Sequence, residues 1–242
     1  MARNSPFDFR YIVDMKHIKE FAQLFENTQV LTLEQKDWLD KCTKGDWLLN
    51  EETGEVDIWG GDFDCDRQAL TDFKGVRFGH VTGYFMCHTN RLTSLEGAPR
   101  EVGGGFWCTG NKLTSLVGAP RIVGGDFRCN YNKLTSLEGL PGGFSVGGDF
   151  DCCHNELTSL EGAPQVAEDD FDCRYNPVSA LVLKSLYKKM SSGMSWPDAV
   201  ASYWKHIKSD EDKLLLASSN PTLSPEEKRG YAALARHKKR LI

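Results

Sequence analysis

Cysteines are the most reactive side chains in this sequence, and most of them recur at a nearly fixed spacing. Six of the eight are separated by 21 to 23 residues: Cys65, Cys87, Cys108, Cys129, Cys152 and Cys173. Thiols can form disulfides, bind a soft metal or act as nucleophiles. There is no C-x-x-C pair and no cysteine–histidine spacing typical of a zinc site, so we expect reduced thiols packed as small hydrophobic side chains.

Two alternatives for the thiols stay open at this point. If the cysteines lie on neighbouring strands about 4.8 Å apart, they are close enough for some of them to pair as disulfides. Cys153 directly follows Cys152, so it should point outward, as an exposed small residue or as a reactive thiol.

A second group of residues that could bind a ligand consists of aspartates, namely Asp126, Asp149, Asp151, Asp170 and Asp172. Oxygen-rich clusters can hold Ca²⁺, and like charges on adjacent strands cost stability unless something neutralises them. We expect solvation by water and salt, with no metal and no cofactor. The alternatives for neutralising these charges are a calcium ion, a basic segment of a partner and the chain's own basic C-terminal region.

These residues belong to a unit of roughly 21 residues, G-x-F-x-C-x-x-N-x-L-T-S-L-x-G-x-P-x-x-V, which is repeated along the chain. Four near-perfect copies begin at Gly83, Gly104, Gly125 and Gly148. A degenerate copy opens at Gly61, and a broken one runs from 169 to 183. Self-similarity at this period indicates coils stacked into a solenoid, because one coil cannot bury its apolar face alone.

The unit itself predicts how each coil is built. A phenylalanine two residues before each cysteine places both side chains on one face of a short strand. The asparagine three residues after the cysteine is placed to bridge backbone groups of its own and the next coil. The Gly-Gly pairs suit either a positive φ or a close backbone approach, and Gly-x-Pro turns the chain on the far side.

The pattern F-x-C-x-x-N-x-L resembles the L-x-L-x-x-N-x-L unit of the leucine-rich-repeat family. The T-S-L-E-G-A-P form is similar to short-coil repeat proteins encoded by bacteria and their phages, although Gly-Gly adds one residue between Val102 and Phe106 relative to the bacterial effector subclass. The resemblance covers about half of the chain. It implies an α/β repeat fold, a curved solenoid with a parallel β-sheet on its concave face, and protein binding on that face.

We therefore divide the chain into three parts. Residues 1–59 form a helical and hairpin N-terminal cap, 60–183 a solenoid of about six coils, and 184–242 a helical C-terminal cap or small module. In the first part we expect a helix around Met15–Phe25, a second helix from a capping box at Thr32 to Gly45, and a hairpin or a strand feeding the first coil over 47–59. In the last part we expect helices over 183–190, from Ser195 and from Ser224.

Side chains that alternate with the buried phenylalanines and cysteines should line the concave face. Exposed aromatic residues together with an arginine are typical of a protein-binding surface. The sequence therefore predicts a partner-binding set made of Tyr84, Met86, Trp107, Arg128, Tyr131, His154 and Tyr175.

The distribution of charge and the lack of catalytic motifs limit the classes of function that we expect for this chain. Residues 60–183 carry 10 basic and 16 acidic side chains, a net charge of −6, whereas 184–242 carry a net charge of +6. An acidic solenoid makes nucleic acid an unlikely partner, because duplex binding needs clustered lysine and arginine. No nucleophile, zincin or phosphate-loop motif is present, so we expect no enzymatic activity.

Residues 1–6 lack the apolar segment of a signal peptide, and no apolar run is long enough to span a membrane. We accordingly expect a cytoplasmic protein of a bacterium or infected host, and possible incorporation in a virion. The leading hypothesis is a non-enzymatic module that binds a protein of unknown identity. The alternatives are a structural component of a phage particle or comparable assembly, and an effector or regulator acting on a host protein. The oligomeric state does not follow from the sequence.

Overall fold

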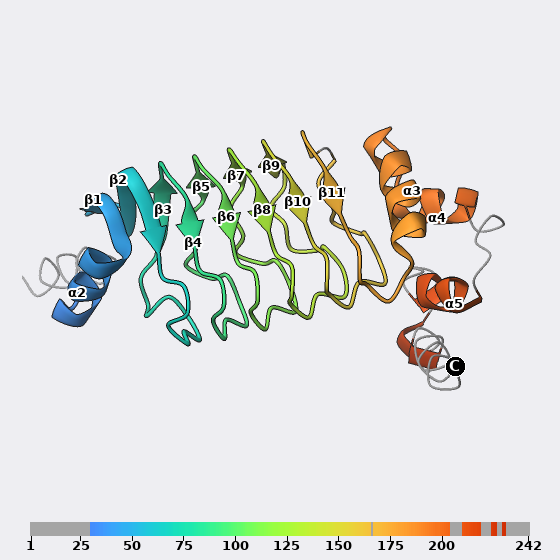
Figure 1. The fold of residues 1–242 in the computed structure, drawn as a ribbon, viewed down its shortest axis with the longest axis horizontal. Coiled ribbons are helices and arrows are strands. Elements are labelled where there is room, and N and C mark those ends of the chain that lie inside the picture. Colours follow the sequence, from blue (N-terminus) through green and yellow to red (C-terminus); the bar gives the residue numbers. More distant parts are fainter. Residues whose placement is uncertain (1–29, 166, 204–209, 219–223, 227–228, 231–242) are drawn as a thin grey trace, which may run out of the picture.

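A computed structural model describes residues 30–165, 167–203, 210–218, 224–226 and 229–230. In this part of the chain, parallel strands stack into a β-solenoid of about six turns, with helices beside both ends (Figure 1). The helix predicted around Met15–Phe25 lies outside the described residues, as do the basic residues 236–240 and most of the helix predicted from Ser224.

The N-terminal helix begins as predicted but ends earlier. Helix α2 (Leu33–Cys42) carries the expected capping box, in which the Gln35 amide donates to Thr32 Oγ1 and the Thr32 amide donates to Gln35 Oε1. Gly45 does not end the helix, because strand β1 (Thr43–Asn50) already begins at Thr43. Gly45 instead lets two strands approach closely, since a Cβ there would lie 2.5 Å from the Trp59 carbonyl oxygen.

The hairpin leads directly into the solenoid. Strand β1 pairs antiparallel with β2 (Glu55–Asp64), and β2 continues into the first coil, where it pairs in parallel with two different strands. One is β3 (Phe78–Val81) and the other is β4 (Phe85–Met86). Both features considered for this segment, a hairpin and a strand feeding the first coil, are therefore present.

From β2 onward the strands form two parallel rows. The row headed by β4 contains β6 (Phe106–Trp107), β8 (Phe127–Arg128), β10 (Phe150–Asp151) and β11 (Phe171–Asp172). The row headed by β3 contains β5 (Glu101–Val102), β7 (Ile122–Val123) and β9 (Ser145–Val146). The sequence pattern predicts the first row but not the second, whose inward residues are the valines that end each unit.

The Gly-Gly pairs join the two rows, and they are there for close approach rather than for a positive φ. A Cβ on Gly103 would lie 2.3 Å from the Thr82 carbonyl oxygen, and one on Gly124 would lie 2.1 Å from that of Gly103. Carbon and oxygen atoms cannot come so close, so only glycine allows the backbones of successive coils to meet at this bend. The glycines of Gly-x-Pro, such as Gly118 at φ +87°, are the ones with positive φ.

The interior is built from ladders of identical side chains. The phenylalanine rings of the first row stack on one another along the solenoid, with centroids 5.1 to 5.6 Å apart. The cysteines two residues later are fully buried, and so are the leucines of each L-T-S-L segment. The prediction that phenylalanine and cysteine share the inner face is confirmed.

The buried asparagines hold neighbouring coils together. Asn132 Nδ2 donates to the carbonyl oxygens of Cys129 in its own coil and Cys108 in the preceding one, at 3.0 and 3.1 Å. Its Oδ1 accepts from the Leu113 amide at 3.0 Å. Asn111 and Asn155 repeat this arrangement. The predicted bridging is confirmed, except that each asparagine reaches back to the preceding coil and not forward.

Helices contact both ends of the stack. On the N-terminal side, Trp38 of α2 packs edge-on against Phe63 and Phe78. On the C-terminal side, Tyr187 of α3 (Ala180–Ser191) stacks on Phe171 with ring centroids 3.8 Å apart. Beyond α3 lie α4 (Trp196–Tyr203) and α5 (Asp210–Ser218). The helix predicted over 183–190 is confirmed, and its Leu183 and Leu186 are buried.

Candidate functional site

The outward side chains of the first strand row define the candidate site. In-register pairing places the residues that directly follow the stacked phenylalanines in one column, namely Asp64, Met86, Trp107, Arg128, Asp151 and Asp172. The residues directly before the phenylalanines form a neighbouring column. A third column consists of the residues two positions after each cysteine: Arg67, Thr89, Gly110, Tyr131, His154 and Tyr175. All of the sequence-predicted site residues therefore belong to three parallel columns.

The structure divides the predicted partner-binding residues into two clusters. The first cluster consists of Tyr84, Trp107 and Arg128, on three successive coils. The Tyr84 ring meets the Trp107 indole edge-on at 5.3 Å, and the Arg128 guanidinium lies over the indole at 5.0 Å. Arg128 also forms a 2.7 Å ion pair with Asp126. Met86 lies in register beside Trp107. The cationic and aromatic groups of this cluster are thus already engaged with one another.

Gly105 makes room for the first cluster. It occupies the column of Tyr84 and Asp126, but a Cβ there would lie 2.8 Å from Trp107 Nε1 and 3.0 Å from Tyr84 Cε1. The Trp107 indole nitrogen therefore lies where a side chain at position 105 would begin. Its Nε1–H is shielded from solvent and has no acceptor among the described residues, which is a cost that the ring contacts of Trp107 must offset.

The second cluster is a stack of three rings, Tyr131, His154 and Tyr175, which we call the aromatic ladder. Ring centroids are 4.2 Å apart in both steps, with interplanar angles of 11° and 17°. All three residues have left-handed backbones, with φ of 54°, 50° and 57°. This conformation is unfavourable for bulky side chains, by roughly 1 kcal/mol or more each. Nevertheless, Tyr131 and Tyr175 are 55% and 68% exposed, so little burial offsets that cost.

Several aspartates of the predicted acidic cluster have a structural role that the sequence did not reveal. Asp126 Oδ1 accepts a hydrogen bond from the Asp149 amide at 3.1 Å, and Asp149 Oδ1 accepts one from the Asp170 amide at 2.9 Å. Asp62 does the same for Tyr84. Each carboxylate thereby pairs with an N–H of the following coil, next to the Gly-Gly bend. An aspartate recurring directly before the phenylalanine was the available signal.

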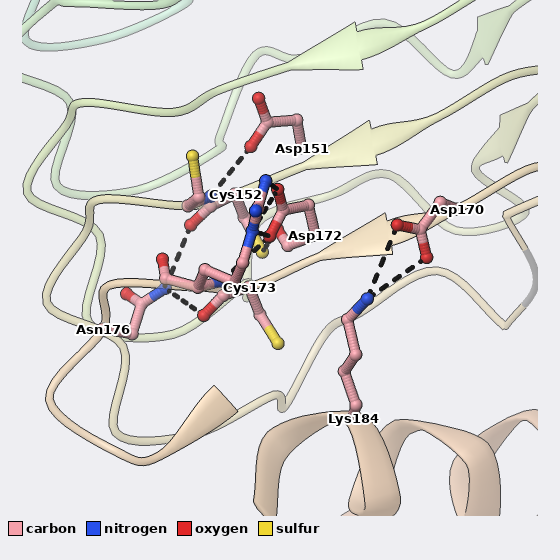
Figure 2. A network of polar contacts seen from close by, with 9 residues as sticks. Asp151, Cys152, Asp170, Asp172, Cys173, Asn176 and Lys184 are labelled. Atoms are coloured by element: carbon pink, nitrogen blue, oxygen red, sulfur yellow. Dashed lines mark hydrogen bonds and ion pairs between the residues drawn. The ribbon is translucent and has the colours of Figure 1, made fainter. Parts of the chain in front are cut away.

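Basic residues neutralise part of the acidic cluster. Arg174 binds both carboxylate oxygens of Asp172, with distances of 2.6 and 3.0 Å, and this contact holds the pKa of Asp172 below its ordinary value. Lys184 reaches from helix α3 to Asp170 at 3.3 Å, as Figure 2 shows. Asp126 is paired with Arg128. Within the described part of the chain, Asp149 and Asp151 have no ion pair.

One group in this region has a metal-ligand composition, namely Asp151, Cys153 and Asp172, whose ligand atoms lie within 4.8 Å of one another. Both oxygens of Asp172 are already bound by Arg174. Burial, followed by the hydrogen bond and charge of Asp151, raises the pKa of the Cys153 thiol to about 12. The expectation that Cys153 points outward is therefore wrong, both as an exposed small residue and as a reactive thiol: only 8% of the residue is exposed, and the raised pKa keeps its thiol protonated at neutral pH.

The remaining thiols are inert for the same reason. All eight cysteines are free and buried. Burial is the largest cause in each case and raises the pKa of the ladder thiols, from Cys65 to Cys173. A thiol with a raised pKa is a poor nucleophile at neutral pH. The expectation that the ladder cysteines pack as small buried side chains is confirmed.

A hollow of about 530 Å³ lies along the second strand row, away from the predicted site residues. His80, Arg100, Glu101 and Arg121 line it, together with Gly79, Ala119 and Pro141. Arg100 is paired with Glu55 at 2.7 Å, and Glu101 adds a second carboxylate to the lining. The arginine after each proline in P-R-E-V and P-R-I-V was the available sequence signal for this groove.

No family model, curated protein or solved structure matches this chain. Within the described residues, every helix is too short or too polar to cross a membrane.

Proposed function

We propose that this chain is a non-enzymatic protein-binding module with a leucine-rich-repeat-like solenoid, and that it binds its partner through the outward side of the first strand row. In this proposal that side is the concave face, and the helices at the two ends act as caps that cover the terminal coils. The buried, protonated thiols are consistent with a role that needs no nucleophile.

The observation that carries the proposal is the aromatic ladder. A coil that needs a left-handed backbone conformation at one position can use glycine there, as the coil that begins at Gly104 does with Gly110. Tyr131, His154 and Tyr175 accept the backbone cost instead, and they leave two tyrosines largely exposed. Ring stacking returns only about 0.5–1.5 kcal/mol per pair. Exposed tyrosines held rigidly by strained backbones are better explained by binding than by stability.

The charge of the surface indicates the kind of partner. Asp151 ends strand β10 and Asp149 directly precedes it, on the coil that carries His154 of the ladder. Neither aspartate has a basic partner in the described residues. The solenoid as a whole has a net charge of −6. A protein that presents a basic segment is therefore the partner that fits this surface.

The test is affinity capture from native lysate with three forms of the chain. The wild type is compared with Tyr131→Asn/Tyr175→Asn, which removes two rings while asparagine tolerates the left-handed backbone. Ile122→Ala, at an exposed residue of the second row, is the matched control.

We expect one protein to be captured by the wild type and by Ile122→Ala, and to be lost with the tyrosine double variant. Capture that is equal for all three forms would place binding elsewhere and overturn the proposed surface. No captured protein, together with high-order self-association of the chain, would favour an assembly component instead.

A further inference from the structure

The aromatic ladder stops at one end, next to the coil that begins at Gly104. In that coil the position equivalent to Tyr131 is Gly110, which has no side chain to continue the stack. Tyr131 stacks on His154 on one side. Over its other face lies neither a ring nor a cation of the described residues. We call this position the Gly110 gap, and the ring face that borders it is open.

The coil itself does not require glycine at the gap. Gly110 has a φ of 67°, but Thr89 and Tyr131 hold the same left-handed conformation in the coils on either side. A Cβ on Gly110 would also fit, because its nearest neighbours are atoms of Thr89 at 3.7 to 3.8 Å, which is ordinary contact distance. Thr89 and Tyr131 are two coils apart, or about 9–10 Å at ordinary strand spacing. The gap is therefore a surface feature with room for one planar group.

A column of cations runs beside the gap, and we call it the basic column. Arg91, Lys112 and Lys133 each lie two positions after a residue of the ladder column, on the other side of one buried asparagine. Backbone hydrogen bonds of 2.9 Å, from the Lys112 amide to the Leu92 carbonyl and from the Lys133 amide to the Leu113 carbonyl, keep successive coils in register here. All three basic residues are exposed, and none has an ion pair among the described residues.

Few carboxylates offset these charges near the gap. From its first glycine through L-T-S-L, neither the coil that begins at Gly83 nor the one that begins at Gly104 has an aspartate or glutamate. The same part of the coil that begins at Gly125 has only Asp126, which is paired with Arg128. The other acidic residues of these coils lie on the Gly-x-Pro turns or in the second strand row, namely Glu96, Glu101 and Glu138. The surface around the gap is therefore locally basic.

Charge and shape together select the ligand. A locally basic surface favours an anion. The carboxylates of an acidic peptide would pair with the cations but would leave the open face of Tyr131 unused. A nucleotide combines a phosphate, which lysine and arginine bind, with a planar base, which stacks on aromatic side chains. The base must be unpaired to stack, so a single strand or a free nucleotide fits and a duplex does not.

We infer that the Gly110 gap and the basic column bind a nucleotide, with its base stacked on the open face of Tyr131 and its phosphate held by the basic column. This inference goes beyond the proposed function, because it assigns a second class of ligand. The solenoid's net charge of −6 disfavours nucleic acid as a partner, but that sum includes carboxylates on other coils. Local charge decides whether one nucleotide binds at this position.

The test measures binding of a fluorescein-labelled single-stranded oligoadenylate to the full chain, by fluorescence anisotropy over a series of salt concentrations. An abasic strand of the same length keeps the phosphates and removes the bases. An oligoglutamate peptide represents an acidic protein segment, and free AMP is added as a competitor. Circular dichroism and urea unfolding check that every variant is folded.

The ring is tested with Tyr131→Asn, because asparagine tolerates the left-handed backbone and removes the stacking face. We expect the wild type to bind the oligoadenylate more tightly than the abasic strand or the oligoglutamate peptide. Tyr131→Asn should weaken oligoadenylate binding roughly five- to tenfold and leave the affinity for the abasic strand unchanged.

The basic column is tested with Lys112→Gln. This variant should weaken binding of both strands and lower the slope of log affinity against log salt by about 0.7. The matched control is Arg121→Gln, which removes an exposed arginine of the second row that also has no ion pair among the described residues, and it should leave the slope unchanged. Competition by AMP would show that one nucleotide suffices, whereas oligoadenylate binding without such competition would show that a strand is the ligand.

Equal wild-type affinity for the oligoadenylate, the abasic strand and the oligoglutamate peptide would reveal an unselective basic surface and overturn the inference, as would unchanged oligoadenylate binding in Tyr131→Asn. The outcome is separable from that of the proposed function. If no strand binds but a captured protein still depends on Tyr131 and Tyr175, the proposed function stands and the nucleotide site is wrong. If the oligoadenylate binds as expected while no protein is captured, the nucleotide site stands on its own.

Discussion

Neighbouring residues on one short strand, Phe127 and Arg128, differ completely in how they repeat from coil to coil. Phe127 points inward and has a phenylalanine at the equivalent position of every coil of its row, from Phe63 to Phe171. Arg128 points outward, and its equivalents are aspartate, methionine and tryptophan. The inward residues are fully buried, whereas the outward ones are partly exposed.

This difference separates stability from recognition. Inward residues must fit identical neighbours above and below, so the solenoid restricts each of them to one residue type. Outward residues are free of that restriction except where they pair with a backbone amide, as Asp126 and Asp149 do. The variable outward residues are consequently where a function specific to this chain can be encoded.

The largest loss of stability is expected from removing one ring of the stacked phenylalanines inside the solenoid, which form its inner ladder. Phe127 is fully buried and stacks on Phe106 and Phe150 at 5.4 and 5.2 Å. Phe127→Ala should lower the free energy of unfolding by about 3–5 kcal/mol, because it removes buried area and leaves a cavity. Urea unfolding measures this, with Ile122→Ala as an exposed control. A loss below about 1 kcal/mol for Phe127→Ala would contradict the inner-ladder account.

The next largest effect concerns the asparagine ladder. Asn132→Leu leaves the Leu113 amide and two cysteine carbonyls without their side-chain partner. Since these groups are buried, the free energy of unfolding should fall by about 3 kcal/mol. Asn130→Ala, two residues earlier, removes only a part-buried side chain bonded to the Thr109 hydroxyl and should cost less, about 1 kcal/mol. Equal losses for the two variants in urea unfolding would show that the bridging bonds contribute little.

A smaller effect is expected at the outward ion pair of Arg174. This guanidinium lowers the pKa of Asp172 in the folded state. The resulting stability is fully present above the unfolded carboxyl pKa of about 3.9, and it is lost as the pH falls through the lower folded-state value. Because Arg174 is exposed and its ion pair with Asp172 is screened by solvent, Arg174→Gln should cost only a small part of the stability at neutral pH.

The pH profile distinguishes this ion pair from a packing effect. The stability difference between wild type and Arg174→Gln should disappear at acidic pH, where Asp172 is protonated in both proteins. Thermal melts over a pH series provide the measurement. A difference that persists unchanged to the lowest pH would show that Arg174 acts by packing rather than through the carboxylate.

The sequence predicts the inward residues far better than the outward ones, for a physical reason. Phenylalanine, cysteine and asparagine at fixed spacing leave one arrangement in which all of them are buried and satisfied, so the solenoid and its asparagine bridges follow from the pattern. The second strand row escapes prediction because its outward residues, Glu101, Ile122 and Ser145, share no type, so a single valine is all that recurs in each of its two-residue strands.

Strand alternation identifies the outward side chains beside the buried phenylalanines, but their contacts could not be predicted. The stacking of Tyr131, His154 and Tyr175 occurs on left-handed backbones, and in that column only Gly110 is of a residue type that signals this conformation. The Cys153 side chain was expected outside because strand alternation was extended past the end of β10 at Asp151. In the structure the chain turns there, and the Cys153 amide donates to Asp151 Oδ1.

The central claim is that the outward aromatic ladder serves binding rather than stability. The most direct measurement compares urea unfolding and partner capture for the wild type and Tyr131→Asn/Tyr175→Asn. Lost stacking and relieved backbone strain are each about 1 kcal/mol per residue and oppose one another. We therefore predict a free energy of unfolding within about 1 kcal/mol of the wild type, together with loss of the captured partner. Destabilisation by several kcal/mol, with capture intact, would contradict the account.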